Sequence, residues 1–367
     1  MSLQTITIIG SGHGGCAAAA VLSLKGYKVK LCEVGNTLHI ENFRKIQENG
    51  GIYLKGIEGD TFTKIDVITT DIKEALKDAQ LICIFYVSTY HEFLAEKIIP
   101  FLEDGQMLFI NPGYMGSLVF SKKLKEYNMV KDIIFIEGET LPFTSRIKEP
   151  RIIEITSRNV IHPVATFPGN KSEKVVNILN NVFPGCIPRK NIIEVALHNP
   201  NLIIHTVGTI MNIGRIEFSK GEFYMYREGF TPSIWNIVKD LDKEKMEVME
   251  RYEIPPTSYF DEFRIRTFGD TSIDPFKGFK KYADESPKGP ESSKSRYITE
   301  DVPIGLGLLH SLGRKAGVNT PICDSLINIA SSINQTNYWE QARTLEKLGI
   351  SNLNVREIIE YLELGGN

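Results

Sequence analysis

The chain has 367 residues, enough for two domains that each bury a substantial core. Its net charge of −3 carries no basic surplus, so we expect no nucleic acid partner. No apolar run reaches the roughly 18 to 20 residues that a membrane span needs, so we expect no membrane association. The five scattered cysteines include no CxxC pair, which argues against a zinc site or a disulfide framework. These features predict a cytoplasmic globular protein with free thiols and no metal site.

The first predicted element is a strand that runs directly into a glycine-rich loop. Thr5–Ile9 is a short apolar run of the kind found in central parallel strands. The loop after it fits the pattern GxGxxG and leads into a helix that ends at Gly26. Gly10 would make the tight turn, Gly12 would let a pyrophosphate approach the backbone, and Gly15 would let the helix lie close to the strand. We therefore predict that a dinucleotide cofactor binds at Gly10, Ser11, Gly12, His13, Gly14 and Gly15.

A carboxylate at the end of the second predicted strand bears on the choice of cofactor. This strand covers residues 27–33, and Glu33 follows Gly15 by 18 positions. A carboxylate there can bind both ribose hydroxyls and would repel a 2′-phosphate. The position favours NAD(H), while NADP(H) stays open. The alternative is a glycine turn in an α/β domain that holds no nucleotide.

The alternation of strands and helices continues through the first half of the chain. Strands are predicted at 81–87, 107–110 and 133–137, and ligands of such sheets lie beyond the carboxyl ends of the strands. We also expect a helix at 171–181 and a β pair formed by residues 151–156 and 160–165. Each residue after these strands could equally be a simple turn residue. The cofactor candidates among them are Val87, Ser88, Pro112 and Gly113, and the substrate candidates are Glu139 and Thr140.

The second half of the chain changes to helical patterns. We expect a Rossmann-type α/β domain with a mostly parallel sheet over residues 1–191 and a mostly α-helical domain over 192–367. His198, His205 and Asn212 recur every seven residues, which puts them on one face of a continuous helix. Asn199-Pro200 indicates a helix start or kink, so His198 could fall outside the helix that carries His205.

The apolar surroundings of His205 predict a buried helix, and a buried histidine needs a hydrogen-bonding partner. It is either a satisfied core histidine or a catalytic one. Asn212 is a candidate for substrate binding. Residues 254–293 are rich in Pro, Gly and aromatics without a clear period, which indicates either disorder or an irregular, lid-like cover.

This segment leads into residues 295–305, where an arginine, two carboxylates and an aromatic precede an apolar helix. Unpaired ions are costly away from water, so these groups need partners. Taken alone, the segment could equally be a structural ion-pair corner. The sequence Arg296-Tyr297-x-x-Glu300-Asp301-x-Pro303-x-Gly305 after a nucleotide domain resembles the opine dehydrogenases, the octopine and nopaline dehydrogenase family. Residues 139–143, 201–205 and 343–349 are also similar to that family.

The resemblance covers nearly the whole chain and implies particular roles for three residues. Relatives of this kind have a histidine–aspartate dyad and a substrate-binding arginine in the cleft between their two domains. By motif these are His205, Asp301 and Arg296, with His198 as the weaker histidine. Many relatives carry proline after the histidine, whereas Thr206 stands here, which bears on the local helix geometry more than on the chemistry.

The activity that the resemblance implies is that of an NAD(P)H-dependent opine dehydrogenase. Such an enzyme condenses an amino acid with a 2-oxo acid to an imine and reduces it by hydride. One alternative is a two-domain dehydrogenase that reduces a 2-oxo acid directly to a hydroxy acid. Another is a non-catalytic NAD-binding sensor. The identities of the two small-molecule substrates stay open, as does the formation of a homodimer.

Overall fold

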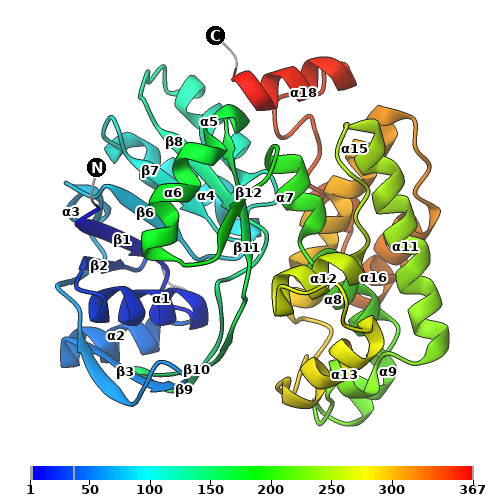
Figure 1. Cartoon of the computed structure of the whole chain (residues 1–367), viewed down its shortest axis with the longest axis horizontal. Helices are drawn as coiled ribbons and strands as arrows, with labels where there is room; N and C mark the ends of the chain where they lie inside the picture. The colour runs from blue at the N-terminus through cyan, green and yellow to red at the C-terminus, as the bar shows by residue number, and fades with distance from the viewer. Residues whose placement is uncertain (1–2, 36–37, 366–367) are drawn as a thin grey trace. The chain divides into compact units, whose positions relative to one another are not determined.

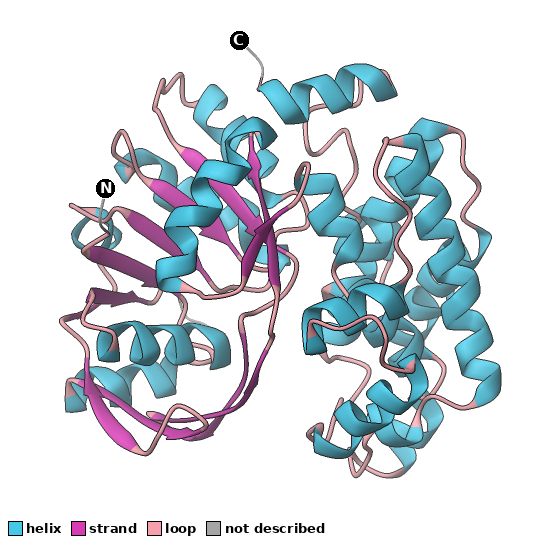
Figure 2. Ribbon diagram, in the orientation of Figure 1, coloured by secondary structure: helices cyan, strands magenta, loops and turns pink. Residues whose placement is uncertain are grey.

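The computed structural model describes residues 3–35 and 38–365, which form two compact units. One unit takes residues up to 195 together with 363–365, and the other takes residues 196–362. Every strand among the described residues lies in the first unit, and the second is built of helices (Figures 1 and 2). The predicted fold class, a Rossmann-type α/β domain followed by a helical one, is confirmed.

The first unit is organised around an eight-stranded sheet in the order β12-β11-β8-β7-β6-β1-β2-β5. Neighbouring strands are parallel except that β11 runs antiparallel to β8. The predicted strands at 5–9 and 107–110 are confirmed residue for residue. The strands are β1 (Thr5–Ile9), β2 (Lys28–Cys32), β5 (Val67–Thr69), β6 (Leu81–Ile84), β7 (Met107–Ile110), β8 (Ile134–Gly138), β11 (His162–Phe167) and β12 (Cys186–Pro188).

The order of these strands locates the edge of the sheet where a ligand binds. Strand β1 lies between β2 and β6. The chain moves outward from β1 to β2 and later crosses back to build the other half of the sheet from β6. In open parallel sheets, ligands bind beyond the carboxyl ends of the strands at such a switch point. The glycine loop after β1 and the residues after β6 therefore lie at the expected ligand edge.

Helix α1 (His13–Leu24) contacts a second sheet in addition to the first. This four-stranded sheet has the order β4-β3-β10-β9, formed by β3 (Gly51–Gly56), β4 (Thr61–Lys64), β9 (Phe143–Glu149) and β10 (Ile152–Arg158). Because both sheets approach α1, its residues from Gly14 to Leu22 are buried, and most of them are Gly or Ala. The other helices of this unit are α2 (Ile40–Asn49), α3 (Ile72–Leu76), α4 (His91–Ile98), α5 (Gly116–Glu126) and α6 (Ser172–Val182).

The predicted β pair of residues 151–156 and 160–165 is wrong. These runs are β10 and β11, which belong to different sheets. The hairpin partner of β10 is the preceding strand β9, across a turn that contains Arg151 at φ +66°. Strand β11 pairs instead with β8 and β12. Two adjacent apolar runs suggest a hairpin, but the tight turn lies before β10 rather than after it.

The second unit begins within α7 (Ile192–His198) and ends within α18 (Val355–Leu364). The predicted interruption at Asn199-Pro200 is confirmed, because a new helix begins at Asn201 and the Asn199 side chain accepts a hydrogen bond from its amide at 3.0 Å. The helices between are α8 (Asn201–Ile210), α9 (Ile213–Phe218), α10 (Met225–Glu228), α11 (Pro232–Arg251), α12 (Tyr259–Phe268), α13 (Pro275–Glu285), α14 (Arg296–Thr299), α15 (Gly307–Ala316), α16 (Pro321–Asn334) and α17 (Tyr338–Gln341).

The segment 254–293 is not irregular, as the sequence suggested, because it contains α12 and α13. Ser258 caps α12 by accepting a hydrogen bond from the Asp261 amide, and Asp274 caps α13 in the same way. The aromatic side chains of the two helices contact one another, with the Phe260 and Phe276 rings 5.0 Å apart. The capping signals of both helices were present in the sequence. In α13 the aromatics Phe276, Phe279 and Tyr282 recur at helical spacing, whereas in α12 apolar residues lie on several sides and hide the helical period.

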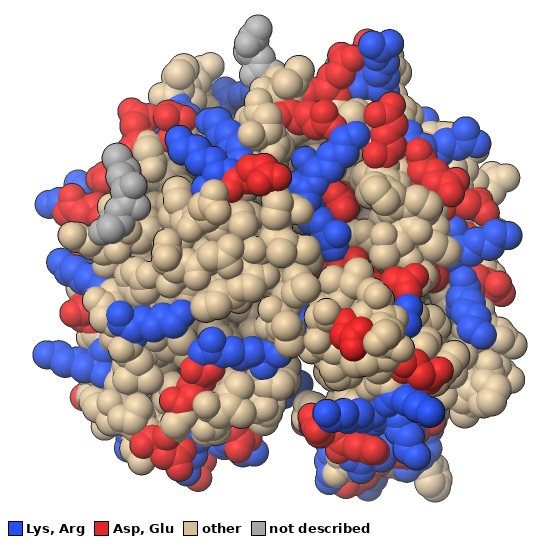
Figure 3. All heavy atoms as spheres, in the orientation of Figure 1, with Lys and Arg blue, Asp and Glu red and all other residues tan. Residues whose placement is uncertain are grey.

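Two properties of the described residues concern their surroundings: the apolar length of the helices and the distribution of surface charge. No helix among residues 3–35 and 38–365 is both long enough and apolar enough to cross a membrane. Positive and negative side chains intermingle over the face seen in Figure 3, as expected for a net charge of −3.

The glycine loop gives a prediction for stability. An added Cβ at Gly15 would lie 1.9 Å from the backbone oxygen of Gly10, which cannot move without opening the turn. At Gly14 it would meet only the methyl ends of Leu141, at 3.0 Å. We expect Gly15→Ala to lower the thermal stability of the first unit by about 1–3 kcal/mol and to abolish NADH binding. Gly14→Ala is the matched control for stability, which thermal melting measures, and NADH fluorescence titration measures binding by the Gly15→Ala variant. Equal behaviour of the two variants would contradict this account of Gly15.

Candidate active site

The glycine loop lies at the carboxyl end of β1, on the sheet edge where a nucleotide is expected to bind. Gly10 has a φ of +108°, which side chains rarely adopt, and so turns the chain sharply at the end of β1. Helix α1 follows with Gly12 as its N-cap residue and without a side-chain cap. The first amides of α1 are therefore available to an anion such as a pyrophosphate. His13 contributes its backbone here, because its Nδ1 accepts a hydrogen bond from the Ile147 amide at 3.0 Å.

Glu33 follows β2 at the same edge and is buried. Its carboxylate accepts a hydrogen bond from the Ser11 amide at 2.8 Å and another from the Ser11 hydroxyl. The Tyr86 hydroxyl donates to its other oxygen. These contacts fix a carboxylate beside the glycine loop, where ribose hydroxyls would lie in a bound dinucleotide.

The other predicted cofactor residues follow the neighbouring strands of the sheet. Val87 is half-buried and Ser88 buried, and both come after β6. Pro112 and Gly113 are buried after β7. Since β1, β6 and β7 are adjacent and parallel, their carboxyl ends meet at one edge. The amides at the start of α1, the Glu33 carboxylate and the residues after β6 and β7 therefore fit a bound dinucleotide.

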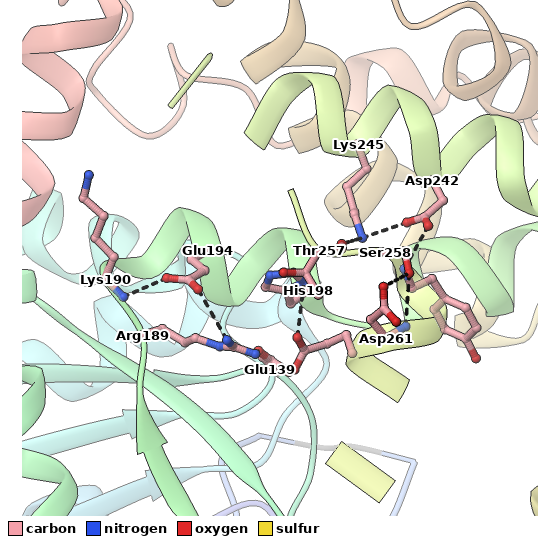
Figure 4. A network of polar contacts seen from close by, with 12 residues as sticks. Glu139, Arg189, Lys190, Glu194, His198, Asp242, Lys245, Thr257, Ser258 and Asp261 are labelled. Carbon is pink, nitrogen blue, oxygen red and sulfur yellow. Dashed lines mark hydrogen bonds and ion pairs between the residues drawn. The ribbon is translucent and has the colours of Figure 1, made fainter. Parts of the chain in front are cut away.

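The predicted substrate residue Glu139 is already engaged in a buried ion pair. It follows β8, and its carboxylate lies 3.1 Å from the guanidinium of Arg189 (Figure 4). Arg189 also contacts Glu194 at 3.4 Å, and Glu194 accepts a hydrogen bond from the Lys190 amide. The charge of Glu139 is therefore balanced within its own unit. Thr140, the next residue, is half-buried.

The centre of the second unit is a buried histidine bonded to a buried aspartate. His205 lies in α8 and is 4% exposed, and Asp301 is fully buried at the start of a π-helix, Asp301–Leu306. The His205 Nδ1 lies 2.8 Å from an Asp301 oxygen. An ionised carboxylate can only accept, so Nδ1 carries a proton and Nε2 keeps the lone pair of the neutral ring. The two residues that the sequence assigned to a dyad thus lie together, 96 positions apart in the chain.

Two tyrosines complete the surroundings of His205, and neither was identified from the sequence. The Tyr297 ring stacks on the imidazole at a centroid distance of 3.6 Å and an angle of 10°. The Tyr226 hydroxyl lies 3.0 Å from His205 Nε2. Tyr297 stands inside the Arg296–Asp301 motif, so that motif could have suggested it. Tyr226 lies in α10, 21 positions beyond His205, and no sequence pattern marks it.

Arg296 and Glu300 form the remaining ion pair of this region. They are one helical turn apart, and the Arg296 guanidinium lies 3.1 Å from the Glu300 carboxylate. Glu300 is buried, whereas the Arg296 side chain is 42% exposed. Its guanidinium carbon also lies 5.5 Å from the centre of the Tyr297 ring. Glu300, which had no assigned role, thus orients an arginine that still reaches solvent.

Two other candidates of the second unit have structural contacts. Asn212 donates from its amide nitrogen to the backbone oxygens of Gly208 and Gly229, at 2.9 and 3.1 Å. Only its side-chain oxygen could face a ligand, which weakens its assignment to substrate binding. His198 ends α7, outside the helix of His205, and lies 3.9 Å from Glu262.

No group of three or more His, Cys, Asp or Glu side chains that could hold a metal ion occurs among residues 3–35 and 38–365.

Both units match known families. Residues 188–334 match the family described as NAD/NADP octopine/nopaline dehydrogenase, alpha-helical domain. Residues 5–115 match the family described as NAD-dependent glycerol-3-phosphate dehydrogenase N-terminus. The first match includes His205, Arg296 and Asp301.

Whole-chain similarities point the same way. The chain is 29% identical to an opine dehydrogenase of Arthrobacter sp. (strain 1C) over 363 residues, 98% of this chain and 99% of the relative. A structure of octopine dehydrogenase with NADH and agmatine has a TM-score of 0.73 at 17% identity and covers 97% of this chain and 98% of its own. A yersinopine dehydrogenase structure with NADP⁺ bound has a TM-score of 0.70 at 12% identity and covers 99% and 98%. At these identities the structures establish a common fold.

Proposed function

We propose that the chain is an NAD(P)-dependent oxidoreductase of the opine dehydrogenase family, which acts on CH–NH groups and joins an amino acid to a 2-oxo acid by reductive condensation. The observation that carries this proposal is the buried His205–Asp301 pair, which lies within the matched helical domain. Arg296, which pairs with Glu300 just before Asp301 in the chain, supplies a guanidinium that can bind a carboxylate.

The dyad supplies proton transfer near neutral pH, which imine formation requires. The amino nitrogen must lose protons, and the oxygen of the 2-oxo acid must gain them before it leaves as water. Imidazole suits both directions, since its ordinary pKa lies close to 7. Asp301 fixes the tautomer of His205 and stabilises the imidazolium form. Tyr297, stacked on the ring, adds an aromatic face against the same cation.

Arg296 supplies carboxylate recognition. Both proposed substrates carry a carboxylate, and guanidinium binds such groups through two parallel hydrogen bonds. The pairing with buried Glu300 limits the number of side-chain orientations, and Arg296 uses only one nitrogen on Glu300, which leaves other donors for a ligand. Fixing one carboxylate in this way would orient the oxo carbon of the substrate.

The first unit binds the dinucleotide, with the amides at the start of α1 for the pyrophosphate and Glu33 for the ribose. When bound, the reduced cofactor supplies the hydride that reduces the imine. We propose that NAD(H) is preferred. The Glu33 carboxylate is held at the edge of β2 by Ser11 and Tyr86 and would repel a 2′-phosphate.

The direct test is NADH oxidation measured for each of several amino acids combined with pyruvate, oxaloacetate or 2-oxoglutarate. We expect oxidation only when both an amino acid and an oxo acid are present. Each substrate alone is the control. Oxidation with the oxo acid alone would indicate a hydroxy acid dehydrogenase, and tight NADH binding without turnover on any pair would indicate a sensor.

The same measurement with the amide of the preferred oxo acid examines Arg296. Removing the substrate charge should lower kcat/KM if Arg296 holds that carboxylate. Equal values for acid and amide would contradict this assignment.

Removing either member of the dyad should slow the reaction strongly. We expect His205→Ala and Asp301→Asn each to lower kcat by about 10²- to 10⁴-fold, the usual range for acid–base groups. The matched control is His310→Ala, which removes another histidine–aspartate bond of the same unit, with Asp324 at 2.6 Å. Its kcat should stay near that of the wild type. Near-wild-type rates in either dyad variant would refute the assignment.

The cofactor preference has its own test. Glu33→Gln removes the charge that opposes a 2′-phosphate, so the ratio of kcat/KM for NADPH to that for NADH should rise roughly tenfold or more. Glu58→Gln, which removes the ion-pair partner of Arg158 in the same unit, is the control and should leave the ratio unchanged. An unchanged ratio in Glu33→Gln would assign the preference to another residue.

A further inference from the structure

The imidazole of His205 is contacted at both ring nitrogens and on one ring face. Nδ1 faces Asp301 at 2.8 Å, and Nε2 faces the Tyr226 hydroxyl at 3.0 Å. Tyr297 covers a ring face at 3.6 Å. A proton that enters or leaves His205 at Nε2 therefore meets the oxygen of Tyr226 first.

Tyr226 is held in this position by other aromatic rings. Its ring centre lies 6.4 Å from that of Phe230 and 6.2 Å from that of Phe279. The Tyr282 ring approaches edge-on at 5.2 Å, and the Tyr282 side chain helps to raise the pKa of Tyr226. These contacts come from α13 as well as from the loop after α10, so the hydroxyl is fixed beside Nε2 rather than free to turn away.

The hydroxyl of Tyr226 stays protonated under ordinary conditions. Burial raises its pKa well above the usual value, with smaller contributions from Tyr282, Tyr297 and Tyr259. It can therefore act as a neutral donor and acceptor at the same time. With Nε2 as a lone pair, Tyr226 donates to His205. With His205 as imidazolium, Nε2 donates to the Tyr226 oxygen, whose own proton then points to another acceptor.

We propose that the Tyr226 hydroxyl is the group that exchanges protons with the substrate, and that the His205–Asp301 dyad acts through it as the proton store. Tyr282 is a positioning residue that orients the Tyr226 hydroxyl. This inference rests on the proposed function, because it names the atom through which the same dyad acts.

The chemistry balances without any outside acid. An ammonium and an oxo group give an iminium and water, so two protons move from nitrogen to oxygen and the net charge is unchanged. In each transfer the nitrogen gives a proton to the Tyr226 oxygen while the Tyr226 proton passes to Nε2. The reverse movement then protonates the substrate oxygen. Between the loss and the return of the first proton, the nitrogen lone pair bonds to the oxo carbon and the C=O π pair moves to the oxygen, which takes that proton. After the second transfer the carbon–oxygen bond breaks, its electron pair leaves with water, and the nitrogen lone pair completes the C=N bond. His205 ends neutral.

The test is Tyr226→Phe, which keeps the ring contacts and removes the hydroxyl. We expect kcat for condensation to fall about 10²-fold while NADH affinity stays unchanged. The dependence of kcat on the D₂O fraction should be curved in the wild type, because two protons move together, and linear in the variant. The matched control is Tyr252→Phe, which removes a buried hydroxyl of the same unit that donates to the Leu312 backbone oxygen, and it should change neither readout. Tyr282→Phe should give an intermediate loss of kcat.

A Tyr226→Phe variant with wild-type kcat and an unchanged curve would overturn the inference. If this variant fails to fold, as judged by circular dichroism and thermal melting, Tyr226→3,5-difluorotyrosine replaces it. That side chain keeps the shape and acidifies the phenol, so an unaltered pH profile of kcat would equally overturn the relay. Failure of the proposed function is seen separately, in a wild type that does not condense amino acid and oxo acid or in an active His205→Ala variant.

Discussion

A carboxylate that is removed from water must have partners, and Asp301 satisfies this requirement by bonding to His205. The bond joins α8 to the π-helix Asp301–Leu306, so one contact links these two elements and sets which nitrogen of His205 carries the proton. The wider π turn begins at Asp301 and contains Pro303, which has no amide hydrogen for a regular helical ladder. The Pro303 carbonyl accepts a hydrogen bond from the Arg343 amide, which ties the C-terminal tail to this turn.

The neighbouring carboxylates Glu300 and Asp301 have different partners because their surroundings differ. Glu300 is buried and pairs with Arg296, whereas Asp301 pairs with the imidazole. Glu300 thus orients the Arg296 guanidinium, which reaches solvent, and Asp301 holds the imidazole of His205 in the interior. Tyr297 contacts both groups, since it stacks on His205 and lies beside the Arg296 guanidinium. The charged residues at 296–301 therefore form two separate pairs, Arg296 with Glu300 and Asp301 with His205. This pairing explains why the two carboxylates are buried and not exposed to solvent.

The first unit follows the same principle, because the polar groups of the proposed dinucleotide site are held by other protein groups. Ser11 and Tyr86 hold the Glu33 carboxylate, and the uncapped start of α1 presents amides beside it. A site built in this way needs little rearrangement on binding. By contrast, the Glu139–Arg189 pair shows that a charged residue at the carboxyl end of a strand can be structural.

Four features were predictable from the sequence: the fold class, the glycine loop, the position of Glu33 at the end of a strand, and the interruption before α8. Each depends on local chemistry, namely strand periodicity, glycine conformation or helix capping. The family motif also selected His205, Asp301 and Arg296. Which polar groups meet became visible only in the folded protein. The tertiary structure placed β10 and β11 in different sheets, bound Asn212 to backbone carbonyls, and put the Tyr226 hydroxyl on His205 Nε2. Such contacts join residues distant in sequence, and no local pattern records them, since they follow from how helices and strands pack.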